Sequence, residues 1–396
     1  MEPLIYLDNH ATTPLDPWVL EAMMPYLTTQ YGNASSLVHA PGRAAAQGVQ
    51  TAREQVAELI GAADPNSLVF TSGATEAINL ALKGVFEQYQ SKGKHFITCR
   101  TEHKAVLDTF DYLGKKGAEI TYLEVDRQGR IDLNELRSVI RPDTVMLALM
   151  SANNETGVMH PIEEIASIAS EQDVLFFCDA TQSVGKVPLE VDRLGIELLC
   201  LSAHKMYGPK GAGALYIRKK SKRIQLAPLL HGGGQENGLR AGTYAVPNIV
   251  GLGAAASLAH QNLADEANRL RTLRDQLEAG LSELPQTLVN GLGAPRLPHV
   301  TNISFRHIRA STLMTRLPRI CMSSGSACVS GSRDPSHVLL AMGHSPEDAF
   351  ATIRLSLGRF TTADEIQEAL EKIHLSVRGL RTESPAWQLF EKGLIP

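Results

Sequence analysis

The segment that decides the fold is Phe177-Cys178-Asp179-Ala180-Thr181-Gln182-Ser183, which Ser202-Ala203-His204-Lys205 follows one strand later. Residues 174–178 form a short continuous apolar run, typical of a strand buried on both faces of a parallel sheet. Residues 197–201 form a second such run, and the stretch between the two is long enough for a crossover connection. We therefore predict two neighbouring parallel strands whose carboxyl ends place the aspartate and the lysine of these segments at one edge of the sheet.

An aspartate beside a lysine suits one cofactor in particular. The carboxylate of Asp179 can hold a pyridinium nitrogen protonated, and the amine of Lys205 can form a Schiff base, as a pyridoxal phosphate (PLP) site requires. An Asp and a Lys at neighbouring strand ends are, however, more often a solvated ion pair. The other strand ends bear on the choice between these two interpretations.

Three further predicted strands also end in polar residues. One leads into Thr71-Ser72-Gly73-Ala74-Thr75-Glu76 and a helix over residues 77–86, whose N-terminus would suit a phosphate. An N-cap role for Thr75 that serves only the helix is the alternative. Two other strands end near His103 and Asn154, which could instead be a surface histidine and a turn former. Together these positions fit the rule that open α/β sheets bind ligands outside the carboxyl ends of their strands.

Lys210 competes with Lys205 for the Schiff-base role. It lies in Gly208-Pro209-Lys210-Gly211, and the glycines predict an exposed, mobile position. Lys205 has Ser202 and His204 beside it, which could help to hold a phosphate, so we assign the Schiff base to Lys205. The chain has no G-x-x-x-x-G-K-[ST], no G-x-G-x-x-G after a strand and no H-E-x-x-H, which excludes the nucleotide-binding and metalloprotease motifs.

The length of 396 residues is too great for one ordinary core, and we predict an α/β protein of two domains. Residues 248–284 are predicted to form one or two long helices that leave the main domain, and residues 291–298 are rich in Gly and Pro. We place a large domain, with a mainly parallel mixed sheet flanked by helices, at residues 15–260. A smaller α+β domain takes residues 1–14 and 261–396.

Helices are also predicted before the sheet begins, near residues 18–26 and over residues 41–61. The second of these has charged residues that we expect to form a solvated face: Arg43, Arg53, Glu54 and Glu58.

Charge and composition exclude several classes of partner. With 38 basic and 42 acidic residues interspersed, the chain has no basic stripe for direct nucleic-acid binding and no polybasic segment for a membrane. It has no signal-peptide pattern and no apolar stretch long enough to span a bilayer, so we expect a cytoplasmic protein. The five cysteines lack zinc-site spacing, which argues against a disulfide framework or a structural metal, and Cys99, Cys178 and Cys200 lie in apolar runs typical of burial.

A run of small uncharged residues, 323–332, carries one thiol, that of Cys328. Nothing in the run can pack into a core, so we predict an exposed, mobile loop whose cysteine can travel to a substrate. An idle surface thiol is the alternative.

Arg354 lies among apolar neighbours in a strand-like segment, residues 353–360. A half-buried guanidinium in such a segment commonly meets a planar anion, and a substrate carboxylate would serve. An ion pair with one of the domain's own carboxylates is the other interpretation.

These motifs and several others resemble one enzyme family, the cysteine desulfurases of the IscS/NifS type. The match runs in order from residue 6 to about residue 390, and it is carried by Tyr6-Leu7-Asp8, Ala11-Thr12-Thr13-Pro14, Phe70-Thr71-Ser72-Gly73-Ala74-Thr75-Glu76, Thr101-Glu102-His103-Lys104-Ala105-Val106-Leu107, Asn153-Asn154-Glu155, Asp179-Ala180-Thr181-Gln182-Ser183, Ser202-Ala203-His204-Lys205, His231-Gly232-Gly233-Gly234 and Ser323-Ser324-Gly325-Ser326-Ala327-Cys328.

The resemblance implies a class V aminotransferase-like enzyme of PLP fold type I, a homodimer that takes sulfur from L-cysteine and leaves L-alanine. It implies that Lys205 holds PLP through a Schiff base, that Asp179 pairs with the pyridine nitrogen, and that His103 stacks on the ring and moves protons. Cys328 would attack the substrate sulfur, carry it as a persulfide and pass it to an acceptor such as an iron-sulfur scaffold protein. Cys328 could also ligate an iron-sulfur cluster transiently.

The resemblance also implies the remaining site residues. Gln182 would reach the ring oxygen, and Asn154, which also borders the cofactor, would hold the substrate carboxylate together with Arg354. The phosphate would be held by Ala74, Thr75, Ser202 and His204, joined by Thr243 of the partner subunit.

The sequence departs from the family pattern at a few places. Asn237 and Ala241 stand where many relatives have Arg and Ser, and Val329 follows the cysteine where Thr is usual. The chain also ends soon after Trp387, so the resemblance does not extend to the tail with which some relatives dock an iron-sulfur scaffold. Two alternative functions stay open: a selenocysteine lyase or related PLP enzyme, and a catalytically idle partner in sulfur assembly.

Overall fold

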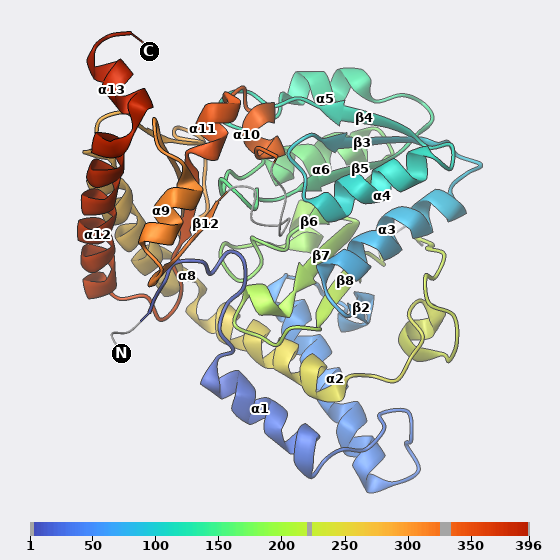
Figure 1. The fold of residues 1–396 in the computed structure, drawn as a ribbon. Helices are drawn as coiled ribbons and strands as arrows, with labels where there is room; N and C mark the ends of the chain where they lie inside the picture. Colours follow the sequence, from blue (N-terminus) through green and yellow to red (C-terminus); the bar gives the residue numbers. More distant parts are fainter. Residues whose placement is uncertain (1–3, 220–223, 325–333, 395–396) are drawn as a thin grey trace.

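The computed structural model describes residues 4–219, 224–324 and 334–394, and within these ranges its centre is a seven-stranded sheet (Figure 1). In spatial order its strands are β2 (Leu68–Thr71), β8 (Gly213–Ile217), β7 (Leu198–Ser202), β6 (Leu175–Asp179), β5 (Thr144–Met150), β3 (His95–Cys99) and β4 (Glu119–Leu123). β8 is antiparallel to both of its neighbours, and the other neighbouring pairs are parallel. The sheet is therefore mixed and mainly parallel, as predicted.

The strand pair from which the prediction began is present. β6 and β7 are parallel neighbours, with Cys178 beside Leu199. β6 ends at Asp179, and β7 ends at Ser202, so that Lys205 follows within one short turn. The predicted placement of the aspartate and the lysine at one edge of the sheet is confirmed.

Helices cover both faces of the sheet (Figure 1). The helices before β8 are α1 (Pro17–Thr28), α2 (Ala40–Leu59), α3 (Ala74–Gln88), α4 (Lys104–Gly114), α5 (Leu133–Val139), α6 (Ile162–Glu171) and α7 (Val191–Leu194), and the 3-10 turns of the described chain are η1 (Pro65–Ser67), η2 (Ala203–Lys205) and η3 (Gln235–Gly238). In β5, Leu147 and Leu149 pack with α2 and α6, whereas Met146 and Ala148 pack with α3 and α4. Both faces of the strand are buried, which explains its continuous apolar run.

One long helix, α8 (Val246–Ser282), joins this core to another. Its first half packs in the cluster that contains α2, and Leu270, Leu277 and Leu281 pack in a separate cluster. That second cluster belongs to a four-stranded sheet, in the order β12 (Ser323–Ser324), β13 (Thr352–Ser356), β10 (Val300–Phe305) and β9 (Thr287–Val289). The proposed domain boundary at residue 260 thus falls inside one continuous helix, and the division into two domains remains a proposal.

The N-terminal strand belongs beside the C-terminal part of the chain. β1 (Ile5–Tyr6) pairs with β11 (Ile320–Cys321) in parallel. The helices of this part are α9 (Ala310–Arg316), α10 (His337–Ala341), α11 (Pro346–Phe350), α12 (Ala363–Glu383) and α13 (Pro385–Glu391). This pairing brings the polar turn after β1 to the edge of the large sheet.

One prediction about α2 is wrong. Arg53 does not face solvent but is buried, where it forms a bidentate ion pair with Glu236 and lies over the ring of Phe70. The partner lies 183 positions away in sequence, so periodicity within the helix could not reveal it. The predicted burial of Cys99, Cys178 and Cys200 is confirmed.

Over the described ranges, no helix combines the length and the apolar character that crossing a bilayer requires.

Candidate active site

A cavity of about 550 Å³ lies at the carboxyl ends of the strands of the large sheet. Its lining includes nine of the residues predicted for the site: Ala74, Thr75, His103, Asn154, Asp179, Gln182, Ser202, His204 and Lys205. These residues follow five different strands, β2, β3, β5, β6 and β7, so the sheet topology alone brings them together. The structure thus groups them as predicted, and their individual roles stay predictions.

Lys205 lies in η2, directly after β7. Its Nζ donates hydrogen bonds to the backbone oxygens of His10 (2.7 Å) and Ala11 (2.8 Å), both in the turn after β1. The amine is therefore held at the cavity wall by a segment from the other end of the chain. Lys210 borders the same cavity from an exposed position, so an experiment must separate the two lysines.

Asp179 presents its carboxylate asymmetrically. Oδ1 accepts hydrogen bonds from the backbone and hydroxyl of Thr181 (3.0 and 2.5 Å) and from the thiol of Cys200 (3.3 Å). Burial, together with the nearby Asp179, raises the pKa of Glu102 well above its usual range, which disfavours a second negative charge beside Asp179. This arrangement fixes the aspartate through one oxygen and leaves the other for a cationic partner such as a pyridinium.

His103 and Asn154 also have defined surroundings. Nδ1 of His103 accepts the backbone N–H of Ala105 (3.1 Å) at the start of α4, which leaves the ring proton on Nε2. Burial, aided by the positive charge of Lys205, lowers the pKa of His103, so the ring is neutral and able to take up a proton. Oδ1 of Asn154 is buried without a hydrogen-bond partner within the described structure, whereas Asn153 closes the turn.

The N-terminus of α3 forms one end of the cavity. Its N-cap is Gly73, with φ of 152°, and no side chain caps the helix there. The alternative in which Thr75 serves as the N-cap is therefore wrong, and the first N–H groups of the helix are left for another acceptor. Ser202 lies against the same turn, since a Cβ at position 73 would come 3.7 Å from its Oγ. Backbone donors and hydroxyls gathered in this way suit a phosphate.

Arg354 does not line the cavity but lies immediately behind it. Its side chain, 4% exposed, forms an ion pair with Asp8 (2.9 Å) and donates to the backbone oxygen of Asn154 (2.7 Å). The ion pair with the chain's own carboxylate is thus present in the structure. Nε of Arg354 is buried without a partner in the described structure, so the guanidinium retains a donor for a further anion.

The other two predicted residues lie elsewhere. Thr243 is exposed, on the loop before α8, and is not among the lining residues. From such an exposed position Thr243 could contact the cofactor phosphate of a second copy of the chain. Cys328 lies outside the described residues, as does the rest of the segment 325–333.

Both flanks of that segment are anchored beside the site. Before it, the hydroxyl of Ser323 donates to Asp8 (2.7 Å), the carboxylate that also holds Arg354. After it, the hydroxyl of Ser336 donates to Glu155 (2.5 Å), which follows Asn154 in sequence. Ser323 and Ser336 are therefore each held by a carboxylate next to the predicted substrate-binding residues.

The cavity wall also includes residues to which sequence reasoning gave no role, among them Ala11, Thr12, Ile78, Met150, Ala152 and Thr181. Oγ1 of Thr12 lies 3.1 Å from Nδ1 of His204. The polar turn that contains Thr12 was visible in the sequence, but its place in the site depends on the pairing of β1 with β11, which no local pattern indicates.

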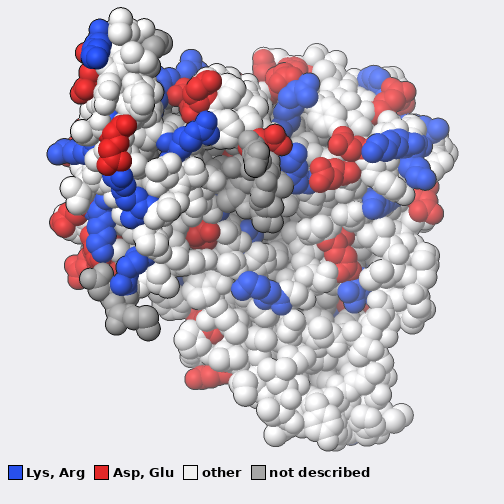
Figure 2. Space-filling view, viewed as in Figure 1, with Lys and Arg blue, Asp and Glu red and all other residues white. Residues whose placement is uncertain are grey.

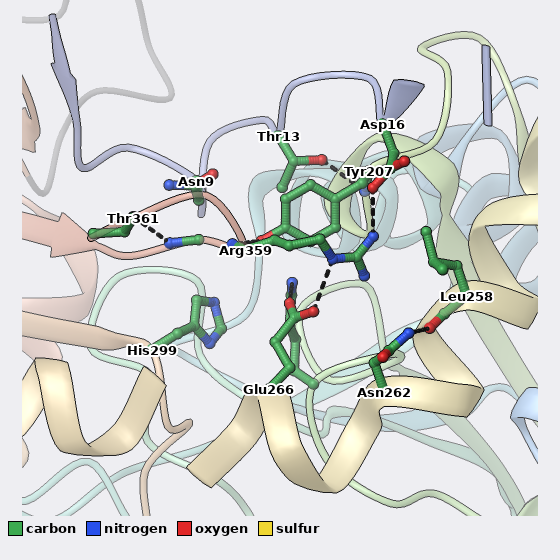
Figure 3. A network of polar contacts seen from close by, with 12 residues as sticks. Asn9, Thr13, Asp16, Tyr207, Leu258, Asn262, Glu266, His299, Arg359 and Thr361 are labelled. Atoms are coloured by element: carbon green, nitrogen blue, oxygen red, sulfur yellow. Dashed lines mark hydrogen bonds and ion pairs between the residues drawn. The ribbon is translucent and has the colours of Figure 1, made fainter. Parts of the chain in front are cut away.

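A second polar cluster surrounds Tyr207 (Figure 3). The ring of Tyr207, two residues after Lys205, is buried, and its hydroxyl accepts the backbone N–H of Arg359 (2.5 Å). The guanidinium of Arg359 lies over that ring at 4.3 Å and bonds both Asp16 (2.7 Å) and Glu266 (2.8 Å). The cluster therefore ties the N-cap of α1, the helix α8 and the segment after β13 to the turn that carries the lysine.

The chain is similar to known proteins over nearly its whole length. The model of the aminotransferase class-V family matches residues 5–369. A protein named cysteine desulfurase IscS from Anaeromyxobacter dehalogenans is 50% identical over 391 residues, covering 98% of this chain and 96% of that protein. A solved NifS-like protein superposes with a TM-score of 0.88 at 38% identity, over 95% of this chain and 100% of the other. A structure titled SspA in complex with cysteine gives 0.80 at 37% identity, over 90% and 100% of the two chains.

The sheet, the cavity and the matched family model define the class: the chain belongs to the class-V aminotransferase family and has the PLP fold type I of its NifS-like neighbours. Within that family, the curated relatives at about half identity over nearly the whole chain are cysteine desulfurases. The resemblance to the IscS/NifS type is thus confirmed.

Proposed function

We infer that this protein is a PLP-dependent cysteine desulfurase that converts L-cysteine to L-alanine and transfers the sulfur. The observation that carries the inference is the meeting of Lys205, Asp179, His103 and the uncapped N-terminus of α3 around one cavity. Relatives that cover almost the whole chain are named as cysteine desulfurases, and one similar structure is titled as a complex with cysteine. Both observations support the inference.

The described residues fit PLP. Asp179 has one carboxylate oxygen fixed and can hold a ring nitrogen protonated with the other, and Gln182 lies at the same wall. Ala74, Thr75, Ser202 and His204 surround the place for the phosphate at the start of α3. Lys205 would hold the cofactor covalently. When bound, PLP supplies an electron sink for the carbanion formed at the substrate α-carbon.

The chain's own groups then bind the substrate and move protons. Arg354 and Asn154 would hold the substrate carboxylate, to which the unpartnered Nε of the arginine can donate a hydrogen bond. The amine of Lys205 would take the proton from the α-carbon, because its anchors, the backbone oxygens of His10 and Ala11, place it at the cavity wall. His103, neutral and protonated on Nε2, would pass protons to and from the leaving fragment.

Cys328 would perform the sulfur transfer. Its thiolate attacks the substrate sulfur, an S–S bond forms, and the C–S bond breaks with its electron pair left on the carbon fragment. That fragment takes one proton at its β-carbon, regains one at its α-carbon from Lys205 and leaves as alanine, and the persulfide on Cys328 passes its terminal sulfur to an acceptor. The anchors at Ser323 and Ser336 support this proposal, because they fix both ends of the cysteine-bearing segment beside the substrate-binding residues.

The partners are a second copy of the chain and a sulfur acceptor. Figure 2 shows mostly uncharged side chains over α1 and the residues that follow it. The large apolar side chains exposed there are those of Trp18, Leu20, Met24, Leu27, Tyr31, Leu37 and Val38. A second copy covering such a face would bury this surface and could bring Thr243 of the partner subunit to the phosphate. An iron-sulfur scaffold or another sulfur-acceptor protein would receive the persulfide sulfur.

Replacement of the thiol tests the function. Cys328→Ser should abolish sulfide release from L-cysteine while the purified protein keeps its yellow cofactor. Full cysteine-dependent turnover in this variant would show that another group is the nucleophile. Alanine release measured from cysteine and from selenocysteine separates the desulfurase from a selenocysteine lyase, and absence of cofactor and of turnover in the wild type would indicate an idle assembly partner.

A further inference from the structure

Glu76 places a carboxylate in the wall of the cavity, in the first turn of α3 and next to Thr75. A carboxylate at this point is at odds with the proposed ligand, because the phosphate group of PLP is itself an anion. Burial alone would raise the pKa of Glu76, but hydrogen bonds from Arg240 and Ser72 outweigh it and lower the pKa below its usual value. Glu76 is therefore ionised near neutral pH, and its charge acts on any anion bound beside it.

Arg240 supplies the opposite charge. Its Nε donates to Oε1 of Glu76 at 2.8 Å and its Nη2 donates to Oε2 at 3.3 Å. Oε2 also accepts the backbone N–H of Ser72 at 2.7 Å, in the turn before the helix. The side chains of Arg240 and Glu76 are 25% and 16% exposed, so solvent screens their charges only in part. Both oxygens of the carboxylate are thus engaged by donors.

The position of Arg240 has supports of its own. Arg240 forms a parallel bridge with Leu230, and Glu236 in the same segment is held by Arg53 in a buried ion pair of 2.7 Å. Arg240 therefore reaches Glu76 from a segment that other contacts fix.

We propose that the Glu76–Arg240 pair sets the affinity of this site for the phosphate group of the cofactor. Arg240 neutralises Glu76, so that the N–H groups at the start of α3 face the phosphate without a competing negative charge. The inference rests on the proposed function, because it takes the cofactor phosphate to lie at the turn around residues 72–76. Arg240 is not among the lining residues of the cavity, and in this proposal both side chains act on the cofactor phosphate, so both are positioning residues.

The proposal gives the three variants different outcomes. Arg240→Gln leaves Glu76 charged beside the phosphate and should weaken PLP binding about tenfold, as loss of a charged hydrogen-bond partner does. Glu76→Gln removes the negative charge and leaves Arg240 near the phosphate, so its affinity for PLP should equal or exceed that of the wild type. The double variant should return close to the wild-type affinity. A pair that merely fixes the loop would instead weaken binding in all three variants.

The measurement is a titration of the apo-protein with PLP and, separately, with pyridoxal, which lacks the phosphate, followed by absorbance of the bound cofactor. We expect Arg240→Gln to lower the affinity for PLP and to leave that for pyridoxal unchanged. Arg306→Gln is the matched control, since Arg306 also makes a bidentate ion pair, with Asp348, at similar exposure (32% and 11%) but away from the cavity. The control should bind both compounds like the wild type.

Several results would overturn the proposal. Equal losses for PLP and pyridoxal in Arg240→Gln, or weaker PLP binding in Glu76→Gln, would show a structural role for the pair. If Arg240→Gln does not fold, the affinity of Glu76→Gln still decides the question. Wild-type protein that fails to take up PLP would overturn the proposed function as well, whereas normal uptake with an unaffected Arg240→Gln would overturn this inference alone.

Discussion

Replacement of Arg359 by methionine should destabilise the protein strongly, because it removes the guanidinium from the polar cluster around Tyr207 (Figure 3). Methionine keeps most of the aliphatic stem, so the loss of the guanidinium is the main change. Asp16 and Glu266, 9% and 13% exposed, would each lose the guanidinium that now bonds them at 2.7 and 2.8 Å. The cation–π contact with the ring of Tyr207 would be lost as well. The backbone N–H of Arg359 that bonds the tyrosine hydroxyl would remain.

The magnitude follows from these contacts. A hydrogen bond to a charged group contributes about 1.5–3 kcal/mol, and we take the lower value because Arg359 is 17% exposed. The cation–π contact adds about 0.5–1 kcal/mol. The two charged bonds and the cation–π contact together give an expected loss in the free energy of unfolding of about 3.5–4 kcal/mol, in the range found for breaking one side of a buried ion pair.

Urea unfolding of the apo-protein measures this loss, followed by circular dichroism and by tryptophan fluorescence. The chain has two tryptophans, Trp18 in α1 and Trp387 in α13, so fluorescence reports on both parts of the molecule. Arg141→Met is the matched control, because Arg141 also bonds two carboxylates, those of Glu119 and Asp143, but on an exposed surface. Its unfolding midpoint should stay close to that of the wild type. Equal midpoint shifts for the two variants would refute the reasoning.

Two further outcomes are expected. Burial raises the pKa of Glu155 from 4.5 to about 7, so the stability contributed by its protonated carboxyl is present below pH 4.5 and is lost as the pH rises toward 7. Glu155→Gln should remove this loss. Denaturation curves should then show that the free energy of unfolding of the variant rises relative to that of the wild type by on the order of 1–3 kcal/mol between about pH 5 and pH 7. A difference between the two proteins that does not change with pH would contradict the assignment. Arg354→Lys cannot keep both the ion pair with Asp8 and the hydrogen bond to the backbone oxygen of Asn154. Steady-state kinetics should therefore show a KM for cysteine that is raised about tenfold, with the cofactor content unchanged. An unaltered KM would exclude the arginine from substrate binding.

The central sheet and the strand ends that meet at the cavity could be predicted from the sequence because both depend on local patterns. Apolar runs of strand length that end in polar residues mark β5, β6 and β7, and parallel topology brings such ends to one edge. The long helix α8 was likewise visible in its composition, although its continuity was not. The individual roles of the site residues were inferred from the resemblance to a family and not from these local patterns.

The polar pairs that surround the site could not be predicted in the same way. Arg354 meets Asp8 across 346 positions and Arg240 meets Glu76 across 164, and either arginine could have paired with other carboxylates. The wrong prediction for Arg53 has this cause. A charged residue on an amphipathic helix predicts a solvent-exposed side chain, and its buried partner, Glu236, could not be identified from the sequence. The tertiary fold determines which arginine and carboxylate come together, and the periodicity of the sequence carries no information about these pairs.

The most direct test of the account is to identify the residue that holds the cofactor. Reduction of the purified holoenzyme with sodium borohydride fixes PLP to its lysine, and mass spectrometry of the digested protein then locates the modified peptide. The account predicts a pyridoxyl group on Lys205. A label on Lys210, or a protein that carries no pyridoxyl group, would contradict it.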